Sequence, residues 1–241
     1  MAGPLFLRIE LGVFALRAVI TDASGAVRAE ASSAYDTQAP QPGWSEQRPD
    51  DWWRALRDAC GLLGHQIDLR EIKALRLSGQ HGCVFLDGER EVIRPAIMAD
   101  DTRAQHEAED IEREIGVDRL AAITGRGASP GSAAAAMLWL RRNATIAYKR
   151  LHHVIAPKDY LWLRLTGELS TDVAEALATG LFDVSAGNWS TEIIDALDLD
   201  IGVLPPVRRG VGMVGRVRDD VAAELRLAPG VTVAGLALPS S

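Results

Sequence analysis

One hairpin near the start of this 241-residue chain has the shape of a phosphate-binding turn. The stretch FLRIELGVFALRAVITD, residues 6–22, places a turn at Gly12 between two apolar runs. The backbone N–H groups of such a turn can bind a phosphate, usually together with small hydroxyl side chains. This turn carries Val13 and Phe14 instead. The residues leave three interpretations open: a phosphate site, a site that has lost its ligating groups, and an ordinary hairpin.

A second candidate site follows the run EIKALRLSG, residues 71–79, which has the composition of a buried strand. Gln80, His81 and Gly82 form the turn after it. In α/β proteins the carboxyl edge of the sheet is where ligands bind. An imidazole can both donate to and accept from sugar hydroxyls. The alternative is a turn histidine that contacts no ligand.

Two adjacent carboxylates, Asp100 and Asp101, precede Arg103 in a third candidate segment. A carboxylate that accepts two hydroxyl hydrogen bonds can hold a vicinal diol. Asp101 or Thr102 could equally cap the helix expected over residues 103–115. The two roles are compatible, so the sequence leaves both open.

The elements that must position these residues are strands at first, followed by strands and helices in alternation. This order predicts an α/β domain with a mixed central β-sheet. The apolar patterns and turn signals place strands over residues 5–10, 15–21, 27–34, 71–79, 83–87, 213–218 and 231–235. They place helices from residue 49 and over residues 103–115, 132–143, 157–167, 172–180, 191–198 and 219–227.

Composition restricts the partners. The net charge of −7 argues against a broad nucleic-acid surface, and the longest apolar run, Ala133–Leu140, is too short to span a membrane. The N-terminus has no basic segment of the kind that opens a signal peptide. Cys60 and Cys83 match no metal motif and are typical of a reducing compartment. We therefore expect a cytoplasmic protein without a metal site, a membrane partner or a nucleic-acid partner.

Four stretches resemble the FGGY family of carbohydrate kinases, and among its members the xylulokinases. The resemblance covers nearly the whole chain in order, and residues 157–190 are its most specific part. It implies an actin-like, ribonuclease-H-like domain with a mixed central sheet flanked by helices. The stretches are GWSEQRPDDWW (43–53), LSGQHG (77–82), PKDYLWLRLTGELSTD (157–172) and TGLFDVSAGNWS (179–190).

The resemblance also implies a domain organisation. Family members bind a sugar mainly on an N-terminal domain and ATP with Mg²⁺ mainly on a C-terminal domain. We expect residues 1–241 to form one N-terminal, sugar-binding domain that ends at the inter-domain hinge, without the ATP-binding domain. On this expectation, ATP and Mg²⁺ are family cofactors that this chain alone does not bind.

The resemblance assigns roles to the candidate residues. It makes Gln80, His81, Gly82, Asp101 and Arg103 the expected substrate-binding residues for a ketopentose. The family run Gln-Met-His-Gly is one residue shorter in this chain, and Ala99 and Asp100 replace the Trp and Asn of a family Trp-Asn-Asp run. The stretch PKDYLWLRLTGELSTD suits helix capping and packing, so we interpret it as structural.

The groups that transfer phosphate depart from the family pattern. The family has Asp-Leu-Gly-Thr-Ser where this chain has Glu10, Gly12 and an apolar turn, so we interpret Glu10 and Gly12 as the remnant of a phosphate loop. Glu10 could still reach Mg²⁺ through water. Aligning Val233-Ala234-Gly235 with the family hinge places Leu238 where the general base, an aspartate, is expected, and leucine cannot accept a proton.

Three hypotheses follow. The chain is the N-terminal domain of a xylulokinase-like pentulose kinase, a catalytically inactive relative that binds a sugar or a protein, or a truncated product without a role of its own. For the chain alone we predict no ATP-dependent sugar phosphorylation. We also expect self-association, such as a homodimer, if a surface meant for a second domain is exposed.

Overall fold

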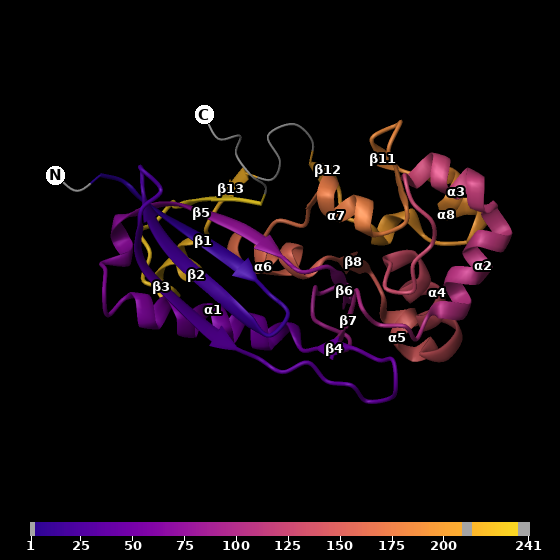
Figure 1. Ribbon diagram of the computed structural model, residues 1–241, viewed down its shortest axis with the longest axis horizontal. Coiled ribbons are helices and arrows are strands. Elements are labelled where there is room, and N and C mark those ends of the chain that lie inside the picture. The colour runs from indigo at the N-terminus through magenta and orange to yellow at the C-terminus, as the bar shows by residue number, and fades with distance from the viewer. Residues whose placement is uncertain (1–2, 209–213, 236–241) are drawn as a thin grey trace.

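Two hydrophobic cores divide the molecule, as the computed structural model of residues 3–208 and 214–235 shows. One lies under a six-stranded sheet and the other among helices at the opposite end (Figure 1). Between them lies a four-stranded sheet in the order β4-β7-β6-β8. No helix in the described part of the chain is long and apolar enough to cross a membrane.

The larger sheet is mixed, as the sequence predicts, with the order β13-β14-β5-β1-β2-β3. β5 runs parallel to both β1 and β14, and the outer pairs are antiparallel. Its strands are β1 (Leu5–Leu11), β2 (Ala15–Asp22), β3 (Val27–Ala34), β5 (Ile72–Gly79), β13 (Val214–Arg216) and β14 (Thr232–Ala234).

Helices cover one face of this sheet. Along β1 buried and exposed residues alternate, so Leu7 and Ile9 point into the core while Arg8 and Glu10 face outward. The buried face packs against α1 (Pro49–Leu63) and α6 (Pro157–Thr166). Pro49 occupies the first turn of α1, where a missing N–H costs no helical hydrogen bond.

The second core is helical. In Figure 1, α2, α3, α4, α5 and α8 gather at the end away from the larger sheet. Ser132 caps α4 by accepting a hydrogen bond from the N–H of Ala135 at 3.3 Å. The helices are α2 (Gln105–Ile115), α3 (Val117–Thr124), α4 (Ala133–Asn143), α5 (Thr145–Arg150), α7 (Val173–Ala178), α8 (Thr191–Ala196) and α9 (Asp219–Glu224).

The patterns in the sequence predict the long elements but not the short ones. They predict neither β7 (Ala96–Met98) nor β8 (His153–Ile155), which complete the smaller sheet with β4 (Glu46–Gln47) and β6 (Gly82–Leu86). A strand of three residues is too short for its hydrophobic period to be recognised. The remaining strands are the two-residue pairs β9 (Thr171–Asp172) with β12 (Val207–Arg208) and β10 (Phe182–Asp183) with β11 (Asn188–Trp189).

Candidate functional site

The turn that carries His81 leaves the larger sheet where β1 and β5 end together. Leu11 and Gly79 are register partners, and the N–H of Gln80 donates to the carbonyl of Leu11 at 2.8 Å. Gly82 then begins β6 against β7, so close that a Cβ on it would lie 2.8 Å from the carbonyl oxygen of Ile97. The turn is therefore fixed at both ends, and His81 stands at the carboxyl edge of the sheet, as predicted.

His81 contacts a carboxylate on α7. Its Nδ1 lies 3.0 Å from Oε2 of Glu175, which is buried, whereas the imidazole is 52% exposed. The hydrogen bond to Glu175 raises the pKa of the imidazole, against the opposing effects of partial burial and of the cations Arg126 and Lys158. The contact thus favours the protonated, doubly donating form of His81.

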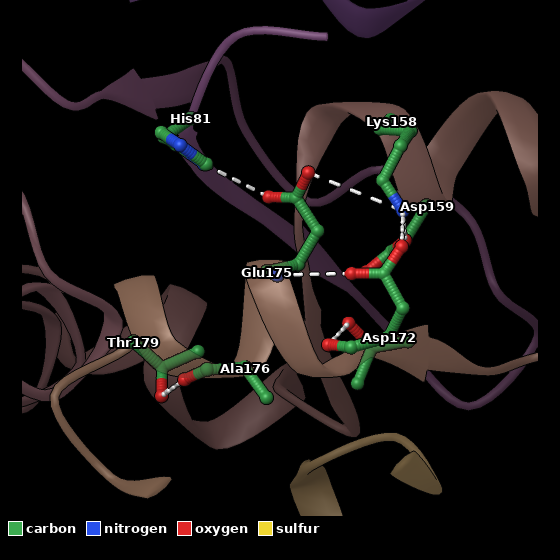
Figure 2. Close-up of polar contacts among 8 residues, drawn as sticks. His81, Lys158, Asp159, Asp172, Glu175, Ala176 and Thr179 are labelled. Carbon is green, nitrogen blue, oxygen red and sulfur yellow. Dashed lines mark hydrogen bonds and ion pairs between the residues drawn. The ribbon is translucent and has the colours of Figure 1, made fainter. Parts of the chain in front are cut away.

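Behind Glu175 lies a buried cluster of charges, shown in Figure 2. The ammonium of Lys158 is 2.7 Å from Asp172 Oδ2, 3.1 Å from Asp159 Oδ1 and 4.0 Å from Glu175 Oε1. Burial would lower the pKa of Lys158, but the surrounding carboxylates outweigh it and raise the pKa. Lys158 therefore stays charged and holds three carboxylates together.

The positions of these carboxylates follow from α6 and α7. Pro157 starts α6, so Lys158 and Asp159 stand in its first turn, where an acidic side chain is favoured by the helix dipole. Asp172 caps α7 by accepting from the N–H of Glu175 at 3.1 Å. The same carboxylate thus fixes the backbone of Glu175 and the ammonium of Lys158.

A cavity of about 110 Å³ opens beside this cluster. One carboxylate oxygen of Asp159, Oδ2, is buried without a hydrogen-bond partner. Burial raises the pKa of the Asp159 carboxyl to about 7, partly offset by Lys158. A polar ligand or a water in the cavity could pair with this oxygen, because buried polar groups are normally satisfied. Polar lining residues include His81, Arg126, Asp159, Thr171, Glu175 and Thr179.

Ala99 forms part of the cavity wall together with Gly131. A Cβ on Gly131 would lie 2.1 Å from the carbonyl oxygen of Ala99, so the two backbones touch. The wall is therefore close-packed at the backbone at this point.

Gln80 lies in the same turn as His81 but its side chain points to a different network. Its Nε2 donates to Oε1 of Gln47 at 2.6 Å, and Gln47 Nε2 donates in turn to the carbonyl of Val13 at 2.8 Å. Gln80 is not among the residues lining the cavity, whereas His81 and Gly82 are. We therefore assign Gln80 to joining the two turns, and its predicted contact with a sugar stays untested.

Asp101 and Arg103 form a buried pair outside the cavity lining. Arg103 donates from Nε to Asp101 Oδ1 at 2.9 Å and from Nη2 to Oδ2 at 2.7 Å, and its guanidinium stacks 3.6 Å from the ring centroid of Trp44. Both partners are enclosed, and the pair braces the segment that carries Ala99. The predicted contact of Asp101 and Arg103 with a sugar stays a prediction.

The helix-cap alternative for this segment is wrong. α2 begins at Gln105 with Ala104 at its N-cap and without a side-chain cap. The carboxylate of Asp101 is used by Arg103 and by the backbone N–H of Ser45, at 2.6 Å. Thr102 donates to the carbonyl of Gly43 at 3.1 Å. The local sequence showed the right residue types, but contacts distant in the chain decide their role.

Comparison with known proteins identifies the domain. The family model for the N-terminal domain of FGGY carbohydrate kinases matches residues 5–238. The chain belongs to the FGGY family of carbohydrate kinases. It is 35% identical over 232 residues to the xylulose kinase of Klebsiella pneumoniae and 34% identical to that of Escherichia coli, each alignment covering 96% of this chain and 48% of the relative.

Solved structures agree. A xyloylose kinase from Brucella ovis superposes with a TM-score of 0.87 at 35% identity, covering 97% of this chain and 48% of that one. Xylulose kinase from Rhodospirillum rubrum gives a TM-score of 0.92 at 25% identity with the same coverage. These matches confirm the predicted actin-like fold and the xylulose-kinase-like character of this FGGY N-terminal domain. The chain spans about half the length of these relatives.

The FGGY family implies ATP and Mg²⁺, but the first hairpin does not offer the groups that would hold their phosphates. The N–H of Gly12 donates to the carbonyl of Ala15 at 3.0 Å, and the carbonyl of Gly12 accepts from the hydroxyl of Tyr35. Val13 and Phe14, 50% and 72% exposed, supply no hydroxyl. The hairpin keeps its shape without fitting the ligand, so we assign no phosphoryl-transfer step to it.

Two further predictions concern a metal site and the position of Leu238. Among the described residues, no group of three or more His, Cys, Asp or Glu side chains is arranged to hold a metal ion, and Glu10 stands exposed on the open face of β1. Leu238 lies outside the described residues, so its predicted place stays a prediction. β14 runs parallel to β5, which brings Gly235 to the same sheet edge as His81.

The residues that the sequence analysis missed come from the stretch interpreted as purely structural. Lys158, Asp159 and Asp172 do support α6 and α7, yet they also form the charged cluster behind the cavity. The signal available was the density of charge, since PKD and STDVAE put four ionisable residues on segments otherwise fit for burial. Buried charges are rare without a partner or a function.

Proposed function

We propose that this chain is the sugar-binding domain of a xylulose-kinase-like pentulose kinase, and that a ketopentose binds in the cavity beside His81. One observation carries the proposal. A half-exposed imidazole, a buried carboxylate and the unpaired Oδ2 of Asp159 meet around one cavity in a chain whose relatives are xylulose kinases. Donors and acceptors in this arrangement suit a ligand with several hydroxyl groups.

The proposal extends to domain organisation and cofactors. We propose that residues 1–241 correspond to one domain ending near the inter-domain hinge, and that Mg-ATP binds chiefly to a second domain of the complete kinase. The alignments cover 48% of each of the two xylulose kinases, which supports this division. A reducing intracellular location is part of the same proposal, supported by Cys60 and Cys83, both free and buried.

Titration calorimetry tests sugar binding directly. The 241-residue chain, without ATP, is titrated with D-xylulose, D-ribulose and glycerol. We expect saturable heat with at least one pentulose and its loss in His81→Ala. The matched control is His106→Ala, which removes an exposed histidine on α2, well outside the cavity lining. Absence of pentulose binding, or equal binding by His81→Ala, would contradict the proposal.

A second candidate function is favoured by the hairpin turn. The apolar residues Val13 and Phe14 suit a relative that binds a sugar without phosphorylating it. For the chain alone we expect no turnover above background in a coupled assay with Mg-ATP and each of the three sugars. Turnover would show that the turn and the position of Leu238 do not prevent phosphoryl transfer.

The partner proposal is self-association of the chain through its exposed apolar surface, to which Phe14 contributes. Sedimentation velocity over a range of protein concentrations measures it. A chain that stays monomeric throughout would remove this proposal and leave the sugar-binding proposal intact.

A further inference from the structure

His81 has one ring nitrogen engaged and one available for a ligand. Nδ1 is the nitrogen in contact with Glu175, at 3.0 Å. No hydrogen bond or ion pair recorded among the described residues involves Nε2, and His81 lines the cavity. Because an ionised carboxylate can only accept, the proton of this contact must sit on Nδ1. The contact therefore selects one orientation and one proton position of the ring.

Glu175 is itself held firmly. Its side chain is buried, its backbone N–H donates to Asp172 Oδ1 at 3.1 Å, and its Oε1 lies 4.0 Å from Lys158 Nζ. Lys158 is anchored in turn by Asp172 and Asp159. A line of contacts thus runs from the buried ammonium through Glu175 to the half-exposed imidazole, as Figure 2 shows.

We propose that Glu175 is the positioning residue of the sugar site: it holds Nδ1–H of His81 toward the protein, so that Nε2 faces the oxygen atoms of a bound ketopentose. The proposal rests on the proposed function, since it names how the same site orients its ligand. In the protonated ring Nε2–H is a charge-assisted donor to a hydroxyl or carbonyl oxygen of the sugar.

The charges around His81 support this role. Glu175 on α7 favours the imidazolium, whereas Arg126, which follows α3, and Lys158 on α6 oppose it. Asp159 on α6 lines the same cavity, and Asp172 on β9 stands behind Glu175. Glu175 is the carboxylate in contact with the ring, so its loss should leave mainly the opposing cations and lower the pKa of His81.

The decisive experiment measures the imidazole itself. Nitrogen-15 NMR of the 241-residue chain, without ligand, gives the tautomer and the pKa of His81 in the wild type and in Glu175→Gln. We expect the variant to lower the pKa and to mix the two tautomers, because an amide can donate to Nδ1 as well as accept from it. The control, Asp110→Asn, removes a carboxylate 3.7 Å from His106 and should leave His81 unchanged.

Calorimetry with D-xylulose then connects orientation to binding. We expect Glu175→Gln to weaken binding by about tenfold, the effect of one well-placed hydrogen bond. Glu175→Asp keeps the charge on a shorter arm and should recover part of the affinity. If Glu175→Gln does not fold, Glu175→Asp carries the test, with a loss of about threefold expected from a stretched contact.

The outcomes separate this inference from the proposed function. An unchanged tautomer and pKa in Glu175→Gln, or a D-xylulose affinity within about twofold of wild type, overturns the positioning role while sugar binding stands. Wild-type affinity in Glu175→Asp, when only that variant folds, overturns it too. Failure of the wild type to bind any pentulose overturns the proposed function, and the NMR result still decides whether Glu175 orients His81.

Discussion

The turn that carries His81 and the turn of the first hairpin meet at one edge of the larger sheet, yet their surroundings differ. Leu11 and Gly79 are partners where both turns begin. Behind His81 three buried carboxylates lie within 4.0 Å of the buried ammonium of Lys158, whereas the hairpin turn ends in exposed Val13 and Phe14. Side chains on an exposed turn can be replaced at little cost in stability. Removing one member of a buried charge cluster is costly, because it leaves the other charges buried without a partner.

The comparison explains why this chain has polar groups beside the cavity but no phosphate-binding side chains in the hairpin turn. The positions where a phosphate-binding turn carries its ligating side chains lie on an exposed turn closed by backbone contacts, so the fold does not depend on the side chains there. Groups beside the cavity also cap α7 and begin α6, so the fold and the site use the same residues. The polar groups beside the cavity are therefore tied to the stability of the fold, and the side chains of the hairpin turn are not.

The largest effect should come from removing the shared cation. Lys158→Met leaves Asp159, Asp172 and Glu175 buried around an apolar side chain, and breaking a buried ion pair in this way costs about 3–5 kcal/mol. Urea unfolding measures the loss. The matched control is Lys149→Met on α5, an exposed lysine, which should change stability by less than about 0.5 kcal/mol. Equal losses of stability in both variants would mean that the buried cluster stabilises the fold no more than an exposed lysine does.

A smaller effect should follow from crowding the start of β6. Gly82→Ala would put a Cβ 2.8 Å from the carbonyl oxygen of Ile97, so the backbone must move, at a cost of about 1–3 kcal/mol. Gly61→Ala in α1 has open space and should instead stabilise the helix by about 0.5–1 kcal/mol. Chemical denaturation of the two variants compares them directly. If both variants changed the free energy of unfolding in the same direction, the turn would accept the extra Cβ more easily than its packing indicates.

The next effect depends on pH. A raised pKa means that His81 stabilises the fold fully below its unfolded pKa of about 6.5, and that this stabilisation is lost as pH rises through the higher folded pKa. His81→Gln should therefore cost more stability at pH 5.5 than at pH 8.5. Solvent screening of a half-exposed ring keeps the difference below about 1 kcal/mol.

Urea midpoints at the two pH values measure this difference, with His106→Gln as the control for an exposed histidine. Asp159, whose pKa of about 7 also lies in this range, is present in every variant, so the paired comparison isolates His81. A larger cost at pH 8.5 than at pH 5.5 would reverse the sign assigned to the contact with Glu175.

Sequence patterns predict the long strands and helices because each of these elements has an apolar face, repeated at its own period, that packs against a core. They also placed His81 at the carboxyl edge of the sheet, since a turn must follow β5. They could not predict that Asp101 turns inward to Arg103 and the N–H of Ser45, because that choice depends on a segment 56 residues away. Nor could they predict the ion pairs of Lys158, because its place in the first turn of α6 fits helix formation alone and its partner Asp172 lies 14 residues away.

The smallest effect should be on the phosphate side, in Phe14→Ser. The ring is 72% exposed and the turn is closed by the contact of Gly12 with Ala15, so stability should change by less than about 0.5 kcal/mol. The serine restores a hydroxyl, but the N–H of Gly12 stays paired with the carbonyl of Ala15, so we expect no saturable heat on titration with Mg-ATP. Phe6→Ser, on β1, where the ring is 37% exposed, controls for loss of an apolar surface ring. A loss comparable to that of Lys158→Met would show that the hairpin turn is as integral to the fold as the cluster behind His81, and the distinction between the two sides of this edge would fail.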